Sequence, residues 1–385
     1  MKTQFSILCL LAFILLGGVG CSKDDETNEG PIALPVLPDP GDVCSCMDDL
    51  QFMKYCYEKF DINKDAKVSK AEANAVFELN VDGCNIKSLT GIEYFTRLRR
   101  LNCYDNQLTS LNLSYNINLE ELICSRNKLS VLKLPKNSVL TDLSCSYNQL
   151  SSLDITQNPS LNRLDCSFNE LKSIAIGKNN SALTYFYCNS NKLTSLDIPS
   201  NSQLYSLECQ DNQLTSLNIA ESECLKGLTC SNNQLTSLNI SKNLKLSHLN
   251  CSYNKLSKLD VTNNAALKVV VCSDNQITNL VLNAELEELD CSNNQLTNLN
   301  INNSKLRALF CYSNNLVSLD ISGSWIGTII DNSMGELLYP LDCAPMETLK
   351  TLYLSNEKDY MRNIPGITSD RSSQYIPEST EIIYK

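Results

Sequence analysis

Histidine and tryptophan are almost absent from this chain, which has one of each among its 385 residues, His248 and Trp325. A single histidine can build neither a histidine-based catalytic triad nor a metal site with several histidines. Basic residues are also too few to balance the acids: 32 Lys and Arg stand against 43 Asp and Glu, which gives a net charge of -11. Because this charge repels phosphate and no basic stripe offsets it, we expect no nucleic-acid partner.

The sequence also lacks an apolar run long enough to cross a membrane. The run from Phe5 to Leu16 is too short to span a bilayer, although it suits the core of an export signal. A catalytic carboxylate pair finds little support, because Asp165 and Glu208 would lie roughly 10 Å apart on a sheet with no cleft predicted around them. We therefore expect a protein that binds through its surface and is not an enzyme.

What the chain does have is a repeat. The pattern L-x-x-L-x-C-x-x-N-x-L occurs eleven times between residues 98 and 316, and each cysteine is followed three positions later by an asparagine, Asn106 through Asn314. A fixed period near 20 residues predicts a solenoid, in which stacked coils share one continuous core. The cysteines, mostly 21 residues apart, are Cys103, Cys124, Cys145, Cys166, Cys188, Cys209, Cys230, Cys251, Cys272, Cys291 and Cys311.

Each repeat can be interpreted residue by residue. Leu101 and Cys103 alternate with Arg100 and Asn102, which predicts a short strand with the leucine and cysteine inside and the polar residues outside. Asn106 follows at the turn, where its side chain can bond backbone groups that the turn leaves unpaired. The remainder, residues 108 to 114, is too short and too rich in Thr, Ser and Asn for a full helix. We expect it to be extended, turn-like or briefly 3₁₀.

This pattern resembles the leucine-rich repeat family, and within it the internalin-like repeats of 21 residues, with cysteine at the third leucine position. The resemblance implies an α/β solenoid: a right-handed superhelix with a parallel concave β-sheet, short non-helical convex segments and a small helical N-terminal cap. We expect a cap over residues 43–78, repeats over 79–325, and degenerate repeats with a C-terminal cap over 326–385. A first coil would place Cys84 in the asparagine position, and Leu349, Leu352 and Leu354 would form a last coil.

The ladder cysteines are expected to be buried and reduced. Side chains in register on parallel strands stand about 4.8 Å apart and point the same way, whereas a disulfide needs facing Cβ atoms about 3.8 Å apart. Zinc needs four ligands in a tetrahedron and not a line of thiols. Buried cysteine instead serves as a small apolar residue. The pairing of the cysteines off this ladder stays open: Cys44, Cys46, Cys56, Cys224 and Cys343.

The amino terminus predicts an export signal over residues 1–20. Its end resembles a bacterial lipoprotein signal, which implies lipidation of Cys21, and an ordinary secretory signal is the alternative. The following Ser22–Glu26 resembles the signal that sends lipoproteins of Bacteroidota to the outer face of the outer membrane, although such a charge run can also be plain linker. Residues 21–42 would then form a tether. We expect a lipid-anchored, surface-exposed protein that contacts the outer membrane through this anchor alone.

A possible cation loop follows the helix predicted over Leu50 to Phe60. The segment resembles an EF-hand or dockerin loop and implies a weak Ca²⁺ site, because Ala66 stands where a glycine is usual. Ser69-x-x-Glu72 is equally a capping box for the next helix, and this use of the same residues is the alternative. The ligands carried over from the resemblance are Asp61, Asn63, Asp65, Lys67 through its carbonyl, Ser69 and Glu72.

The outward strand positions predict a ligand-binding surface on the concave face. Tyr185 and Tyr187 share one coil, and neighbouring coils carry charges of both signs at Arg163, Asp165 and Glu208. Tyrosine with arginine is typical of hot spots for protein partners, so we expect a monomeric protein that binds a protein ligand there. A glycan ligand and a purely structural envelope role are the alternatives. A second, apolar patch would comprise Val269, Val271, Phe310 and Tyr312.

Overall fold

The computed structural model describes residues 34–136, 139–198, 203–301, 305–324, 341–343, 348–354 and 380–384. All of them belong to the compact unit formed by Leu34–Lys385. The predicted signal peptide, the lipidation at Cys21 and the Ser22–Glu26 signal lie outside the described residues, as does Trp325. Within the described ranges, no helix is both long and apolar enough to traverse a lipid bilayer.

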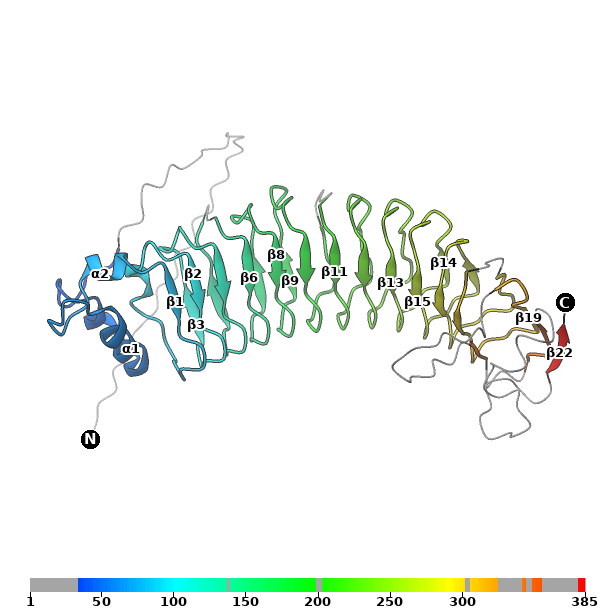
Figure 1. Ribbon diagram of the computed structural model, residues 1–385, viewed down its shortest axis with the longest axis horizontal. Coiled ribbons are helices and arrows are strands. Elements are labelled where there is room, and N and C mark those ends of the chain that lie inside the picture. Colours follow the sequence, from blue (N-terminus) through cyan, green and yellow to red (C-terminus); the bar gives the residue numbers. More distant parts are fainter. Residues whose placement is uncertain are drawn as a thin grey trace, which may run out of the picture. The chain divides into compact units, whose positions relative to one another are not determined.

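A helical cap precedes the repeats (Figure 1). It consists of the 3₁₀ turn η1 (Val43–Cys46), α1 (Leu50–Phe60) and α2 (Lys70–Asn74), and a second 3₁₀ turn, η2 (Ile92–Tyr94), follows in the first coil. The α1 helix begins at Asp49, whose carboxylate accepts hydrogen bonds from the backbone N–H groups of Gln51 and Phe52. The rings of Phe52 and Phe60 pack against Phe95, with centroids 6.4 and 5.6 Å away. These contacts cover the end of the repeat core.

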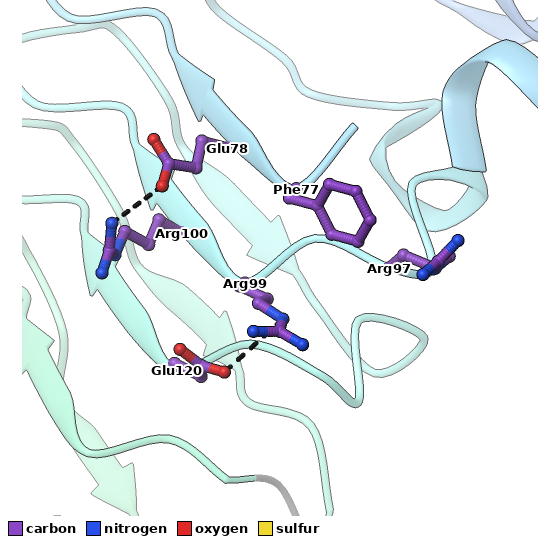
Figure 2. A pocket seen from close by; sticks show the side chains of 6 residues that line it. All are labelled: Phe77, Glu78, Arg97, Arg99, Arg100 and Glu120. Carbon is purple, nitrogen blue, oxygen red and sulfur yellow. Dashed lines mark hydrogen bonds and ion pairs between the residues drawn. The ribbon is translucent and has the colours of Figure 1, made fainter. Parts of the chain in front are cut away.

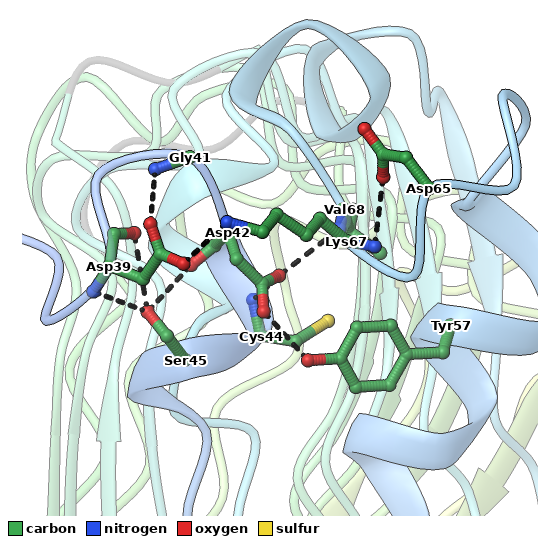
Figure 3. A network of polar contacts seen from close by, with 9 residues as sticks. All are labelled: Asp39, Gly41, Asp42, Cys44, Ser45, Tyr57, Asp65, Lys67 and Val68. Carbon is green, nitrogen blue, oxygen red and sulfur yellow. Dashed lines mark hydrogen bonds and ion pairs between the residues drawn. The ribbon is translucent and has the colours of Figure 1, made fainter.

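One buried carboxylate organises the cap (Figure 3). The Oδ1 atom of Asp42 accepts hydrogen bonds from the backbone N–H groups of Cys44 and Val68, at 2.9 and 3.1 Å, and its Oδ2 accepts one from the Tyr57 hydroxyl at 2.7 Å. Burial and this hydrogen bond raise the pKa of Tyr57. Asp42 therefore connects η1, α1 and the segment before α2.

The repeats form one long parallel sheet of strands two or three residues long (Figure 1). Equivalent residues of neighbouring coils are directly paired, as in Leu101↔Leu122 and Leu122↔Leu143. In the described residues its strands are β1 (Glu78–Asn80), β2 (Arg100–Asn102), β4 (Glu121–Ile123), β6 (Asp142–Ser144), β8 (Arg163–Asp165), β10 (Tyr185–Tyr187), β11 (Ser206–Glu208), β12 (Gly227–Thr229), β13 (His248–Asn250), β15 (Val269–Val271), β17 (Glu288–Asp290), β18 (Ala308–Phe310) and β20 (Leu341–Asp342).

The other side of the coils is extended, as the repeat predicts, and its short strands pair only locally. The pairs are β3 (Ser110–Asn112) with β5 (Val131–Lys133), β7 (Ser152–Asp154) with β9 (Ser173–Ala175), and β14 (Lys258–Asp260) with β16 (Asn279–Val281). A three-stranded group, β19 (Ser318–Asp320), β21 (Thr351–Leu354) and β22 (Glu381–Tyr384), lies near the carboxyl terminus. The solenoid fold class predicted from the sequence is confirmed.

The core consists of the repeat leucines and the ladder cysteines, all of them buried. The ladder cysteines from Cys103 to Cys291 are free thiols, as are Cys44, Cys46, Cys56 and Cys224 outside the ladder. Burial raises the pKa of Cys103 and of Cys251 to about 12, because a thiolate would lose its hydration in the core. These cysteines therefore behave as small apolar core residues.

The ladder asparagines form hydrogen bonds with backbone groups at the turns, as predicted. The Nδ2 atom of Asn148 donates to the carbonyl oxygens of Cys124 and Cys145, at 3.0 and 3.1 Å, and its Oδ1 accepts from the N–H of Leu129 at 2.9 Å. A second column of buried asparagines, which the repeat pattern did not reveal, lies elsewhere in the coils. There Asn264 donates to the carbonyl oxygens of Ile240 and Asn243, both at 2.9 Å. Each column joins a coil to its neighbour.

The first coil of the array has the residue assignment predicted from the sequence, whereas the last coil does not. At the start, Asn106 donates to the carbonyl of Val81, so Val81 takes the ladder position and Cys84 takes the asparagine position, as expected. At the far end two expectations were wrong. Strand β20 pairs with β18, so the buried Cys343 continues the ladder after Cys311. Strand β21, which contains Leu352 and Leu354, pairs with β19 and belongs to the other side of the coils.

Candidate ligand-binding surface

The five predicted ligand-binding residues lie together on three adjacent strands. Tyr185 is paired with Arg163 on β8 and with Ser206 on β11, whereas Tyr187 is paired with Asp165 and Glu208. The side chains alternate with buried Leu164, Phe186 and Leu207, which fix the direction in which they project. The register alone therefore brings two tyrosines, one cation and two carboxylates onto one part of the sheet face.

The side chains of this group interact with one another. The Arg163 guanidinium carbon lies 5.4 Å from the centroid of the Tyr187 ring, a cation–π distance. Partial burial raises the pKa of Tyr187, Arg163 acts to lower it, and Glu208 acts to raise it. The carboxylate of Asp165 accepts hydrogen bonds from the backbone N–H and the hydroxyl of Ser167. Tyr187 and Asp165 are consequently held in place before any ligand arrives.

Sequence reasoning missed two members of this surface. Tyr205 precedes β11, is 40% exposed and lies 5.7 Å from the Tyr185 ring centroid, with the ring planes tilted by 53°. Lys226 Nζ lies 5.2 Å from the Tyr205 ring centroid. Considering the residue before each strand, in addition to the two outward strand positions, would have found both. We call Arg163, Tyr185, Tyr187, Tyr205 and Lys226 the tyrosine patch.

The second predicted patch is divided. Val269 and Val271 lie together on β15, but β17 is the next strand and pairs Glu288 with Val269 and Asp290 with Val271. Phe310 on β18 therefore lies two strands from Val271, with the Asp290 carboxylate position between them. Asp290 thus separates Val271 from Phe310 in the register, and a joint patch of Val269, Val271, Phe310 and Tyr312 stays a prediction.

A pocket of about 360 Å³ lies at the amino-terminal end of the sheet (Figure 2). The guanidinium carbons of Arg97 and Arg99 lie 4.7 and 5.9 Å from the Phe77 ring centroid. Arg100 forms an ion pair with Glu78 at 2.7 Å, and Arg99 pairs with Glu120 at 3.6 Å. Most of the positive charge is thus matched by carboxylates within the pocket. Neither Asp165 nor Glu208 lines this pocket.

The predicted cation loop has a backbone that fits part of the resemblance. Ala66 has φ +64°, the left-handed conformation for which glycine is usual at this position. The Asp61 carboxylate accepts hydrogen bonds from the N–H groups of Asp65 and Ala66, at 3.1 and 3.0 Å, and Asn63 Oδ1 accepts from Asp65 at 3.0 Å. Oxygen atoms of the type that Ca²⁺ prefers as ligands therefore lie close to the loop backbone.

Glu72, the twelfth residue of the loop, is committed elsewhere. Its Oε2 accepts from the N–H and hydroxyl of Ser69, at 2.9 and 2.8 Å, and its Oε1 accepts from the N–H groups of Ile62 and Asn63. These hydrogen bonds, led by the one from the Ser69 backbone, lower the pKa of Glu72. The capping box is fully formed. Among the described residues, no three His, Cys, Asp or Glu side chains converge on a metal position, so Ca²⁺ binding would require Glu72 to exchange partners.

The short parallel strands, leucine core and asparagine ladder define the leucine-rich repeat fold. The fold resembles that of an internalin, InlF, from Listeria monocytogenes, with a TM-score of 0.62 at 21% identity over 89% of this chain and 97% of that one. It also resembles the functional domain of InlJ from the same organism, which includes a cysteine ladder (TM-score 0.54, 23% identity, 82% of each chain). A leucine-rich repeat protein of Leptospira interrogans matches with a TM-score of 0.50 at 26% identity, over 67% of this chain and 80% of its own.

These likenesses concern the fold. Neither the protein-family models nor the curated proteins give a match to this sequence.

Proposed function

We propose that this protein binds a protein ligand through the tyrosine patch on the face of its long sheet. The observation that carries the proposal is the arrangement of three tyrosine rings with two cations at cation–π distance on consecutive coils. Tyrosine and arginine are enriched at the energetic centres of protein interfaces because they combine large contact area with polar groups. Held by the sheet, these rings lose little conformational entropy on binding.

The proposal is tested by replacing the paired tyrosines. The protein is first screened against arrays of purified extracellular proteins and of glycans. The affinity of the double variant Tyr185→Ala, Tyr187→Ala for the ligand so identified is then compared with that of the unmodified protein. We expect affinity to fall by about 10-fold to 1000-fold, because each buried tyrosine anchor contributes about 2 kcal/mol. The matched control, Val269→Ala with Val271→Ala, alters the same two outward positions on β15, which β13 separates from the coil of Lys226.

The outcomes separate the three classes of function. A protein ligand whose affinity falls only in the tyrosine variant supports the proposal. A glycan ligand with the same dependence supports a carbohydrate-binding protein, since tyrosine rings beside carboxylates also suit sugars. Binding that survives in a folded tyrosine variant refutes the assignment to the patch, and absence of any ligand favours the structural role in the envelope.

We also propose that the folded coils stand on the outer surface of the cell, carried by a lipid on Cys21. The support is the apolar run ending in Cys21 and the lysine-and-acid segment Ser22–Glu26 that follows it. Treatment of intact cells with protease should then remove the protein, while a periplasmic marker survives. Persistence of the protein until the cells are lysed would refute the surface location.

For the amino-terminal loop we propose weak Ca²⁺ binding in competition with the capping box. The support is the left-handed Ala66 and the inward-bent oxygens of Asp61 and Asn63. When bound, the ion would be held by these oxygens with those of Asp65, Lys67, Ser69 and Glu72, and it would supply a charged centre that stiffens the cap. Sites of this weak class are occupied at the millimolar calcium found outside cells.

A further inference from the structure

From Cys103 to Cys311, the residue two positions after each ladder cysteine has an unusual backbone. In each cysteine coil of the described array it has φ between 51° and 56°, a left-handed conformation that side chains other than glycine rarely adopt. Glycine takes this position only in the first coil, as Gly83. We call these positions the turn column: Gly83, Asp105, Arg126, Tyr147, Phe168, Ser190, Asp211, Asn232, Tyr253, Asp274, Asn293 and Ser313.

Two aromatic rings of the turn column stack at the protein surface. The centroids of Tyr147 and Phe168 are 4.3 Å apart with the planes inclined by only 8°, and the two residues are 45% and 42% exposed. Bulky residues are unfavourable in this backbone conformation, yet two adjacent coils carry them side by side here. Arg126 closes one end of the stack, with its guanidinium carbon 5.1 Å from the Tyr147 ring centroid and 6.0 Å from that of Tyr104.

The other end of the stack is bordered by a small residue. The next coil runs in register, because the N–H of Phe168 donates to the carbonyl of Asn189 at 3.0 Å and that of Asn169 donates to Ser190 at 3.3 Å. Ser190 therefore follows Phe168 in the turn column, about 5 Å further along. Its hydroxymethyl group is too small to cover an aromatic ring as Arg126 covers Tyr147.

A carboxylate lies beyond this small residue. Asp211 comes next in the turn column and is exposed. Its Oδ2 lies 3.5 Å from the Ser190 hydroxyl, and its Oδ1 accepts a hydrogen bond from Asn232 Nδ2 at 2.7 Å. The Asn232 amide thus holds the carboxylate, which leans toward Ser190. We call the space over Ser190, between the Phe168 ring and the Asp211 carboxylate, the Ser190 gap.

We propose that the Ser190 gap receives an arginine side chain from a partner protein. A guanidinium is planar, stacks on aromatic faces and pairs with carboxylates, so it matches both walls of the gap at once. The protein itself supplies the precedent, because Arg126 already stacks on the opposite end of the same pair of rings. The net charge of -11 favours a cationic partner over an anionic one. This site is separate from the tyrosine patch and does not depend on it.

The probe is a blocked tri-arginine peptide, titrated into the full chain labelled with ¹³C in its phenylalanine rings, with Phe168→Leu used to assign the signal. We expect the Phe168 ring resonances to shift with tri-arginine and to shift far less with tri-lysine or the uncharged tri-citrulline. Equal shifts with tri-lysine would overturn the proposal, because they would indicate plain attraction between opposite charges.

Two variants locate the contact. Asp211→Asn should weaken tri-arginine binding about two- to fivefold, the range of an exposed ion pair, while Asp105→Asn, which removes the same charge elsewhere in the turn column, should leave it unchanged. Ser190→Arg should place a guanidinium in the gap and abolish the Phe168 shift. If Asp105→Asn weakens binding as much as Asp211→Asn, or if Ser190→Arg still binds the peptide, the aromatic stack only stabilises the turns. These readouts are independent of any ligand of the tyrosine patch.

Discussion

The amino-terminal cap and the repeat coils occupy neighbouring parts of one folded unit but are stabilised by different interactions. In the cap, acidic side chains hold the backbone: Asp42, Asp49 and Glu72 each accept hydrogen bonds from several N–H groups. In the coils this work falls to neutral amides such as Asn148, and the cysteines beside them are buried and protonated. Stability of the cap should therefore respond to pH and cations, whereas that of the coils should respond to packing.

The largest effect is expected from removing one amide of the ladder. Asn148→Ala deletes the donor to the carbonyls of Cys124 and Cys145 and the acceptor for the N–H of Leu129. Leaving buried backbone groups without partners should cost about 3 kcal/mol in the free energy of unfolding, measured by urea denaturation. The neighbouring, exposed Gln149→Ala is the control and should change it by less than about 0.5 kcal/mol. Equal effects would show that the ladder does not stabilise the coils.

A somewhat smaller loss is expected when a ladder thiol becomes a hydroxyl. Cys145→Ser places a polar group in the core, and we expect a cost of about 1 to 3 kcal/mol in the free energy of unfolding. Cys224→Ser, at a half-buried position outside the ladder, should cost little. In the native protein, a thiol reagent should label Cys224 before any ladder cysteine, because burial keeps the ladder thiols protonated. Rapid labelling of the ladder would contradict their assignment to the core.

The cap should respond to acid. Burial acts to raise the pKa of Asp49, but hydrogen bonds from the N–H groups of Lys87, Phe52 and Gln51 outweigh it and lower the pKa. A lowered pKa means that the ionised form stabilises the fold above the unfolded value of about 3.9 and that this contribution is lost as pH falls through the folded value. Asp49→Asn keeps an oxygen to cap α1 but places an NH2 group where Oδ2 accepts from the N–H of Lys87, so it should cost about 1 kcal/mol at neutral pH.

The same comparison gives the pH test for Asp49. The difference in melting temperature between Asp49→Asn and the original should shrink as the pH is lowered below about 4. The exposed neighbour Asp48→Asn serves as a control for the loss of one negative charge. A difference that stays constant down to acid pH would mean that Asp49 stabilises the cap without being ionised.

The smallest effect concerns calcium and the loop. Ala66→Gly should relieve the left-handed backbone by about 1 kcal/mol and tighten Ca²⁺ binding, measured by calorimetry and by the melting temperature at millimolar calcium. Glu72→Gln keeps one oxygen to accept from Ser69, but its NH2 group cannot accept from the N–H groups of Ile62 and Asn63, and the charge is lost. It should therefore remove the calcium response while the capping box still starts the helix. Glu58→Gln on α1 is the matched control. If none of these proteins responds to calcium, the loop serves only as a helix cap.

The repeat could be predicted well because the alternation of residues along a strand determines both which side chains are buried and which lie on the sheet face. The alternation around Leu164 and Phe186 determined which side chains share the sheet face, and the 21-residue period determined which of them are neighbours. The final coil was misassigned because Cys343 lies 32 residues after Cys311, which breaks the period that revealed the others. The stack of Tyr147 on Phe168 was missed because the turn was interpreted only through its asparagine, without considering its left-handed neighbour.

Because the coils are stacked in register, the distance between two surface sites is set by the number of coils between them. Each coil presents the same backbone and amide pattern to both neighbours, so a coil can be added or removed without designing a new interface. A coil inserted between β8 and β10 would move Arg163 from Tyr187 by one step of about 4.8 Å, while one inserted between β12 and β13 would leave the tyrosine patch intact and lengthen the molecule by the same step. Duplication of a 21-residue block can thus change the spacing between surface sites in fixed increments, a route by which related chains could be matched to partners of different size.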